Sequence, residues 1–486
     1  MNESPQTPLR WAVIGGGLSG LAACQHLLTV SKSKSTPVEI DLYEASDRLG
    51  GVFGTIEQDG YLLESGADMF ITNKPAGLKL AKQLGLEDRL IETEASYRKS
   101  MILREGRPVP TPAGFDLMAP RQLHPFLKSP ILSPAGKRRV LKEYWIEPDP
   151  KEDESLQDFA VRRFGREAFE RMIQPMIGGI YTADPVKLSL RATLPRFLEM
   201  EKQYGSVLRG LKLHSEQENS ADAIVNNQAS GARYGMFLSF DRGMTVLQDA
   251  LFASIENSIT LYKNSSVENI TLRDNRGYDV SIQNGQTTRT YDGVILAAPG
   301  YVAGKLVEGL NSELSSELNA IPYASAAIVV TGYPLSQIQH PMECFGLVIP
   351  AVENRKVLAV SCTSRKFPNR APKGSIQLRT FIGGALQQHL LEQSDDELLA
   401  MTQQELREIF GVEGTPETTR VVRWNRAMPQ YHIGHLDRVR RIRRQLEKHP
   451  GLAVAGNALN GVGIPDVIQT AQASVEKCWT EIIGAD

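Results

Sequence analysis

A glycine-rich segment near the N-terminus is the first part of the chain whose residue types could do chemistry. It has the spacing G-x-G-x-x-G and reads Gly15, Gly16, Gly17, Leu18, Ser19, Gly20. In such a turn the first glycine allows a tight bend, the second lets the backbone approach a diphosphate, and the third lets a helix pack close to a strand. The N–H groups and partial positive charge of the helix start would then bind the phosphates. The segment therefore predicts a dinucleotide site.

The residues on either side of this segment predict the elements that would position it. Residues 9–14 are mostly apolar, as in a strand buried on both faces, and residues 18–30 carry apolar side chains at helical spacing. Residues 38–43 predict a second strand that ends at Glu44, where a carboxylate can accept hydrogen bonds from a ribose. Together they form a βαβ unit. The alternative is a glycine-rich turn that binds no ligand.

The segment that follows Glu44 identifies the dinucleotide as FAD by resemblance. It is similar to the stretch after the ribose-binding acid in the FAD-dependent amine oxidase superfamily. The resemblance implies that Ala45, Arg48, Gly50 and Gly51 extend the phosphate site. On physical grounds alone, Gly50-Gly51 predicts only a turn.

A second strand–glycine–helix pattern lies near the C-terminus. Residues 452–455 predict a buried strand, and Pro465 suits the first turn of the helix that follows. The start of that helix could face the electron-rich end of a flavin ring and stabilise negative charge there. The alternative is a purely structural helix start. The candidate flavin contacts of this segment are Gly456, Asn457, Val462, Gly463 and Ile464.

Several longer segments resemble the porphyrinogen oxidases of haem synthesis, a family that includes protoporphyrinogen and coproporphyrinogen oxidases. The similarity runs from about residue 9 to residue 479, and the soluble bacterial members are the most similar. The segments that carry it are 64–70, 178–185, 239–244, 321–325, 345–350, 381–384 and Trp424 with 428–435.

The resemblance implies a reaction, its cofactor and its partners. A porphyrinogen would lose six electrons in steps mediated by FAD, O2 would reoxidise the flavin, and hydrogen peroxide would be released with the porphyrin. Coproporphyrinogen III and protoporphyrinogen IX are both candidate substrates. A homodimer and transient contact with other haem-pathway enzymes are also compatible with the resemblance.

Individual site residues are implied by the same resemblance. Gly179 and Asp68 are the candidate catalytic residues, Gly179 because its backbone would lie near the flavin and a substrate pyrrole. Gly66, Ala67, Asp68 and Met69 would form a loop that touches flavin and substrate. Val267 would hold the adenine through its backbone, and Trp424 would contact FAD. The residues expected to line the tetrapyrrole pocket are Phe345, Gly346, Val348 and Phe381. For the two phenylalanines, the alternative is an ordinary place in a hydrophobic core.

Basic residues give less specific predictions. Arg98 and Lys99 precede Ser100, where related proteins often have an arginine, and either could pair with a substrate propionate. A solvated loop is the alternative. The arginine-rich run at 438–444 could contact a membrane surface or a partner, although a solvated helix face is the simpler interpretation.

Composition excludes several function classes. The 486 residues are 41% hydrophobic and 23% charged, as in an ordinary globular protein, and the net charge of −2 argues against nucleic-acid binding. No apolar run is long enough to span a bilayer, and no residue cluster has metal-ligand spacing. The four cysteines, Cys24, Cys344, Cys362 and Cys478, are scattered, which suits a reducing compartment. We therefore expect a cytoplasmic protein without a metal.

The predicted fold is α/β, with a Rossmann-like FAD domain, a mixed-sheet substrate domain and a helical lobe that resembles a membrane-binding lobe. The FAD domain would comprise residues 8–60, 232–300 and 425–484, so that the two termini meet. The substrate domain would comprise 187–231 and 301–424, and the lobe 61–186. Locally, Asn73 is expected to cap a helix with Lys74-Pro75 in its first turn, and Ser394 with Glu397 predicts a capping box.

Two other functions are compatible with this fold. The first is an amine oxidase or a carotenoid desaturase, which would share the flavin site. The second is a non-catalytic carrier on the same scaffold, although two intact dinucleotide motifs argue against it.

Overall fold

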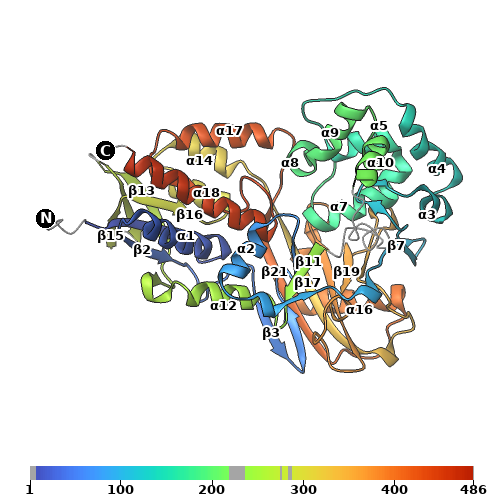
Figure 1. Ribbon diagram of the computed structural model, residues 1–486. Helices are drawn as coiled ribbons and strands as arrows, with labels where there is room; N and C mark the ends of the chain where they lie inside the picture. The colour runs from blue at the N-terminus through green and yellow to red at the C-terminus, as the bar shows by residue number, and fades with distance from the viewer. Residues whose placement is uncertain (1–6, 218–235, 274–275, 283–286, 485–486) are drawn as a thin grey trace.

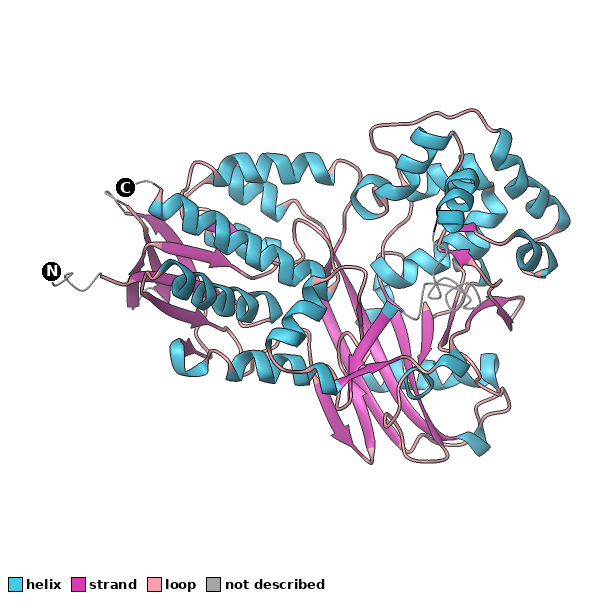
Figure 2. Cartoon of the chain, in the orientation of Figure 1, coloured by secondary structure: helices cyan, strands magenta, loops and turns pink. Residues whose placement is uncertain are grey.

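The computed structural model describes residues 7–217, 236–273, 276–282 and 287–484. Residues 218–231 of the predicted substrate domain therefore lie outside the described residues, as do 232–235, 274–275 and 283–286 of the predicted FAD domain. The structure confirms the predicted α/β fold with a parallel central sheet, as Figures 1 and 2 show. Among the described helices, none is both long and apolar enough to cross a membrane.

A parallel sheet of five strands brings the two ends of the chain together. Its order is β12 (Thr260–Tyr262), β2 (Val38–Tyr43), β1 (Leu9–Ile14), β16 (Gly293–Leu296) and β22 (Leu452–Val454). Both β1 and β22 pair with β16, in parallel register. The predicted meeting of the N-terminal and C-terminal strand–helix units in one sheet is therefore correct.

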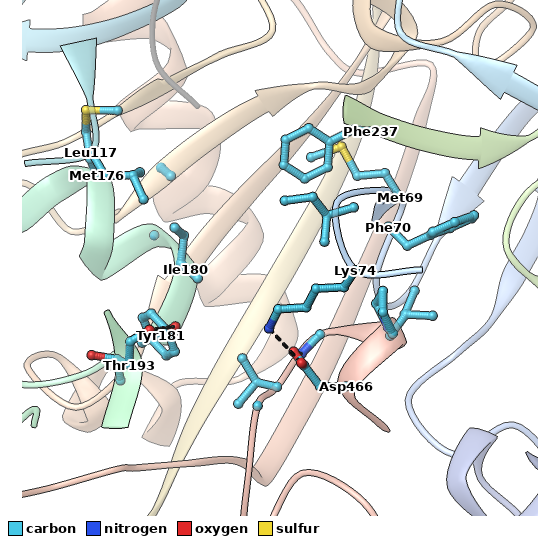
Figure 3. Close-up of a pocket in the computed structure, with 18 of the residues that line it drawn as sticks. Met69, Phe70, Lys74, Leu117, Met176, Ile180, Tyr181, Thr193, Phe237 and Asp466 are labelled. Atoms are coloured by element: carbon cyan, nitrogen blue, oxygen red, sulfur yellow. Dashed lines mark hydrogen bonds and ion pairs between the residues drawn. The ribbon is translucent and has the colours of Figure 1, made fainter. Parts of the chain in front are cut away.

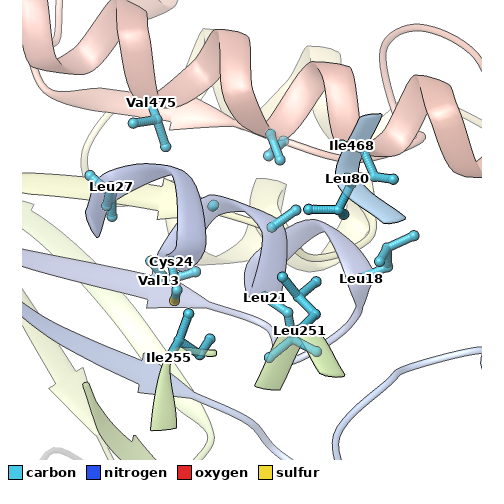
Figure 4. Packing of buried hydrophobic residues seen from close by; sticks show 14 of the residues in the cluster. Val13, Leu18, Leu21, Cys24, Leu27, Leu80, Leu251, Ile255, Ile468 and Val475 are labelled. Atoms are coloured by element: carbon cyan, nitrogen blue, oxygen red, sulfur yellow. The ribbon is translucent and has the colours of Figure 1, made fainter. Parts of the chain in front are cut away.

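Two long helices, α1 (Leu18–Lys34) and α18 (Ile464–Ile483), lie side by side against this sheet (Figure 1). Their facing side chains form one hydrophobic core, with Leu21, Cys24 and Leu27 from α1 and Ile468 and Val475 from α18 (Figure 4). Burial of this apolar surface is the main force that holds the two ends together.

A mixed sheet of seven strands forms a second, separate sheet of the molecule. Its order is β21 (Thr418–Pro429), β17 (Tyr323–Pro334), β20 (Ser375–Gly383), β19 (Ala359–Cys362), β18 (Gly346–Val348), β7 (Ser100–Arg104) and β8 (Arg107–Pro110). The strands predicted near 324–331, 357–361 and 376–382 all lie in it. The β7–β8 hairpin is a correction, because residues 61–186 were expected to be helical and this part of them instead extends the sheet.

The remaining helices of residues 123–217 form a lobe with its own core (Figure 1, upper right). They include α3 (Leu123–Lys128), α4 (Pro134–Leu141), α5 (Leu156–Phe164), α7 (Gln174–Tyr181), α8 (Leu190–Thr193), α9 (Pro195–Tyr204) and α10 (Val207–Gln217). The Glu143 carboxylate accepts hydrogen bonds from the Val207 and Leu208 N–H groups at 2.8 and 3.2 Å, and so caps α10. Arg163 pairs with Glu143 and, at 3.3 Å, with Glu201.

Arg163, Glu143 and Glu201 form a buried ionic cluster, and removal of the Arg163 charge should strongly destabilise the protein. All three side chains have no exposed surface. Arg163→Met would leave the buried Glu143 carboxylate without its cation, whereas Glu201 would keep its pair with Arg162 at 2.6 Å. We expect a loss of about 3 kcal/mol or more in the free energy of unfolding, measured by denaturant titration. Arg166→Met is the matched control, because Arg166 pairs with Glu170 on the surface at 3.3 Å and should change stability by less than about 0.5 kcal/mol. Equal effects of the two substitutions would contradict the prediction.

Candidate functional site

The N-terminal glycine motif brings α1 against the end of β1. Gly15 has a φ of +112°, a conformation that favours glycine. A Cβ atom on Gly20 would lie 1.8 Å from the Gly15 carbonyl oxygen, so no larger residue fits there. The helix therefore begins directly beyond the strand, as the spacing predicts.

The first turn of α1 has the properties of an anion site. Gly17 is its N-cap residue, no side chain caps its N–H groups, and the turn contains no acidic residue. A Cβ atom on Gly17 would meet only Gly51, at 3.8 Å or more, so there is room for a ligand against the backbone. Uncapped amides at a helix start bind phosphate oxygens well. The cradle fits the diphosphate of a dinucleotide.

Glu44 is fixed at the end of β2, next to this cradle. Its carboxylate accepts hydrogen bonds from the Gly16 and Ser46 N–H groups, both at 2.8 Å. Ala45 is the residue between Glu44 and Ser46. The Ser265 N–H donates to the Glu44 carbonyl at 2.9 Å and so brings Val267, at the start of β13 (Val267–Leu272), near the same strand end. Glu44 therefore lies beside the cradle at the end of β2, where the sequence predicts a carboxylate that binds the ribose.

Arg48 shapes the turn that follows. Its guanidinium donates to the carbonyl oxygens of Phe53 at 2.9 Å and Gly51 at 2.6 Å. The side chain thus fixes residues 48–53. The backbones of Gly50 and Gly17 pair in an isolated parallel β-bridge. Arg48, Gly51 and Trp424 line a cavity of about 880 Å³, which also has Lys263, Arg420 and Arg423 in its wall.

The C-terminal glycine motif joins the same cradle. Gly456 has a φ of +106°, and a Cβ atom there would lie 3.0 Å from Ser19 Oγ in α1. Asn457 follows Gly456, and its carbonyl accepts a hydrogen bond from Tyr431 at 2.6 Å. His435 Nε2 donates to the Leu459 carbonyl at 2.9 Å. Two side chains from another segment therefore fix the loop that leads to Val462, Gly463 and the start of α18.

A second cavity, of about 890 Å³, lies where the lobe, the seven-stranded sheet and the start of α18 meet. Figure 3 shows Ile180 and Tyr181 of α7 on one side and Met69 and Lys74 on the other, with Lys74 paired to Asp466 of α18 at 2.6 Å. The wall includes these predicted residues: Met69, Gly179, Phe345, Gly346, Val348, Phe381, Val462, Gly463 and Ile464. The structure thus brings predicted substrate and flavin residues together.

The loop at 65–69 is held in place by buried groups. Trp424 Nε1 donates to the Ser65 carbonyl at 3.0 Å, and Arg379 donates to the Gly66 carbonyl. Asp68 pairs with Lys366 at 3.2 Å and with Arg379 at 3.3 Å. Burial raises the pKa of the Asp68 carboxyl, but the two cations outweigh it and bring the pKa down to about 2. Asp68 is therefore ionised at neutral pH.

The candidate catalytic residue Asp68 is not part of the cavity wall, and neither are the two predicted basic residues Arg98 and Lys99. Arg98 donates to the Thr93 carbonyl at 2.9 Å and pairs with Glu92 at 3.4 Å, while Lys99 is exposed. The cations that do line the cavity, among the described residues, are Lys74 and Lys366. The sequence gives no local pattern for Lys366, whose partner Asp68 lies 298 residues away. Tyr431, also in the wall, lies within a segment that carries the resemblance.

Comparison with known proteins agrees with this geometry. Residues 18–478 match the family of flavin-containing amine oxidoreductases. The chain is 33% identical to the coproporphyrinogen III oxidase of Bacillus subtilis, over 97% of this chain and 98% of the relative. It is 30% identical to the chloroplastic protoporphyrinogen oxidase of Oryza sativa, over 96% and 87%.

Solved structures are also similar over nearly the whole chain. A crystal structure from Exiguobacterium sp. 255-15, whose protein is named as a candidate protoporphyrinogen oxidase, has a TM-score of 0.83 at 27% identity and covers 97% of this chain and 98% of its own. A putrescine oxidase structure has a TM-score of 0.67 at 16% identity and covers 99% of this chain and all of its own. The second likeness shows the fold alone.

The buried histidine of the site predicts a pH dependence of stability. Burial lowers the pKa of His435 to about 4, so the folded protein disfavours its protonation. An unfolded histidine has a pKa near 6.5, so the unfolded state binds the extra proton, and stability present above about pH 6.5 falls as the pH falls towards 4.

We expect His435→Gln to remove this dependence. The wild-type protein should lose about 2 kcal/mol more than the variant between about pH 7 and about pH 5, measured by denaturant unfolding. His26→Gln serves as the control, because His26 lies near the surface beside Glu476. Parallel pH profiles for the wild type and His435→Gln would show that His435 is not the cause.

Proposed function

This chain belongs to the family of flavin-containing amine oxidoreductases, and we propose that it is an FAD-dependent porphyrinogen oxidase of haem synthesis, with coproporphyrinogen III as its substrate. One observation carries the proposal: a single large cavity is lined both by the residues expected to bind a tetrapyrrole, such as Phe345 and Phe381, and by those expected to bind the flavin, such as Gly463. The near full-length similarity to enzymes with these names supports it.

The cofactor would be held by residues from both ends of the chain. The uncapped start of α1 would bind the diphosphate, and Glu44 would bind the ribose. The start of α18, at Gly463 and Ile464, would face the ring system. Bound FAD would accept the electrons that leave the substrate and pass them to O2, with release of hydrogen peroxide.

The protein's own residues would bind, orient and shield the substrate. Val348 and Phe381 give one wall of the cavity an apolar surface, and Gly179 adjoins this wall, since a Cβ atom there would meet only Val348, at 3.9 Å. We assign Asp68 a positioning role, because a carboxylate with a pKa of about 2, paired with two cations, moves a proton poorly at neutral pH. Positioning and exclusion of water are then the main contributions of the chain.

The proposal also covers the domain division of the chain, its location and its partners. We propose the division into FAD domain, substrate domain and helical lobe with the residue ranges given above, except that the β7–β8 hairpin belongs with the substrate sheet and residues 190–217 belong with the lobe. A cytoplasmic location is supported by the free, buried state of all four cysteines. Contact with a membrane through the arginine-rich helix α17 (His435–Leu446) is less favoured, because Arg438 and Arg441 both pair with Glu317. A homodimer and contact with other haem-pathway enzymes are proposed from the resemblance alone.

The direct test is whether each candidate substrate reduces the flavin of the purified, FAD-loaded protein. Anaerobic addition of coproporphyrinogen III should bleach the flavin, and admission of air should produce porphyrin fluorescence with hydrogen peroxide. We expect protoporphyrinogen IX to react more slowly. Putrescine and other amines serve as controls for the rival oxidase function and should leave the flavin oxidised. Reaction with amines but not with porphyrinogens would refute the proposal, and a protein that cannot bind FAD would favour the carrier function.

A further inference from the structure

One wall of the 890 Å³ cavity is a sheet face with two distinct rows of residues. Strand pairing places residues directly opposite each other across β7, β18, β19 and β20, so each row projects from the same face. One row is apolar and the next is polar. The apolar row is Ile102, Val348, Ala359 and Phe381, and the polar row is Ser100, Gly346, Ser361 and Arg379.

The polar row ends in a buried cluster of charges with excess positive charge. Asp68 lies between two cations, Lys366 at 3.2 Å and Arg379 at 3.3 Å. Lys366 is the last residue of α15 (Thr363–Lys366), is only 7% exposed and lines the cavity. Arg379 also interacts with the buried Glu64, but burial raises the pKa of that carboxyl to about 7, so it is only partly ionised at neutral pH. Asp68 and a partly ionised Glu64 leave excess positive charge, which favours the approach of another anion.

Two polar atoms beside this cluster have no hydrogen-bond partner among the described residues. In the part of the chain that the structure describes, Ser361 Oγ is buried without a hydrogen bond, and so is Arg379 Nε. Ser361 itself is 9% exposed and lines the cavity. The Lys366 ammonium has three N–H donors, and within the described ranges Asp68 is the carboxylate with which it pairs. An unpaired buried polar group costs free energy, so a ligand with several acceptor atoms would stabilise this end of the cavity.

We propose that Lys366 and Ser361 form a subsite for a carboxylate group of the substrate. The carboxylate oxygens would accept hydrogen bonds from Lys366 Nζ and Ser361 Oγ, while the ring system lies over the apolar row at Val348 and Phe381. This inference rests on the proposed porphyrinogen oxidase function and deepens it, because the subsite would fix which edge of the tetrapyrrole enters first. Lys366 and Ser361 take the anchoring role for which the sequence suggested Arg98 and Lys99.

The test compares two porphyrins that do not react, coproporphyrin III and its tetramethyl ester. The ester has the same ring but no carboxylate, so only the free acid should use the subsite. Binding to the FAD-loaded protein is measured by quenching of porphyrin fluorescence. Lys366→Met should weaken binding of the free acid by about tenfold or more, because a hydrogen-bonded ion pair is lost, and should leave binding of the ester unchanged.

Two further variants keep the result interpretable. Ser361→Ala preserves every charge of the cluster and should weaken binding of the acid, but not of the ester, by about threefold or more. Lys373→Met removes an exposed lysine from another surface and should affect neither ligand. Bound flavin content and circular dichroism verify that each variant is folded.

The outcomes separate the subsite from the proposed function. Selective loss of acid binding in Lys366→Met and Ser361→Ala would support the subsite. Equal loss of acid and ester, or no loss of either, would overturn it and leave Lys366 as a structural partner of Asp68, with the oxidase function intact. Failure of the wild-type protein to bind either porphyrin would overturn the proposed function, and the subsite with it.

Discussion

The start of α1 lies directly against the end of β1 because Gly20 has no side chain, and the rest of the site depends on this contact. Without it, the uncapped N–H groups of the helix could not lie beside Gly51 and Glu44, and no cradle for a diphosphate would exist. The contact also sets the place of α18, which packs along α1 through Leu21, Leu27 and Val475. A local steric rule thus fixes the relation between the two ends of a 486-residue chain.

Contacts between residues that are distant in the sequence position the rest of the site around this cradle. The loop at 65–69 is held by Trp424 and Arg379, and the loop at 456–463 is held by Tyr431 and His435. Both loops meet the cavity, whose remaining walls come from the seven-stranded sheet and from α7. The cavity is therefore walled by rigid elements, and the charges beside it are held in fixed pairs, which suits chemistry supplied by a cofactor.

The sequence predicts features that depend on neighbouring residues better than features that depend on distant ones. The Ser394–Glu397 capping box and the αL residue Gly411 delimit α16 (Asp395–Phe410), and the glycine spacing gives the βαβ unit. Asn73 is a less successful case, because the helix begins only at Ala76, after Pro75. A residue that precedes proline disfavours the helical conformation, so Lys74 cannot lie in the first turn as expected.

Long-range features escape such reasoning. The β7–β8 hairpin turns at Glu105 and Gly106, both with positive φ, and joins a sheet whose next strand, β18, lies more than two hundred residues further on. Lys366 is held at the cavity by its ion pair with Asp68, which Arg379 fixes from β20. The resemblance, by contrast, named Phe345, Gly346, Val348, Phe381 and Gly179, which the structure does bring to the cavity.

The central claim is that backbone amides at the start of α1 bind the diphosphate of FAD. The most direct test is the affinity of the flavin-free protein for FAD compared with riboflavin, which has the same ring but no diphosphate, measured by quenching of flavin fluorescence. Two or more hydrogen bonds to a charged phosphate should make FAD bind about a hundredfold more tightly or better. Equal affinities for FAD and riboflavin would contradict the account.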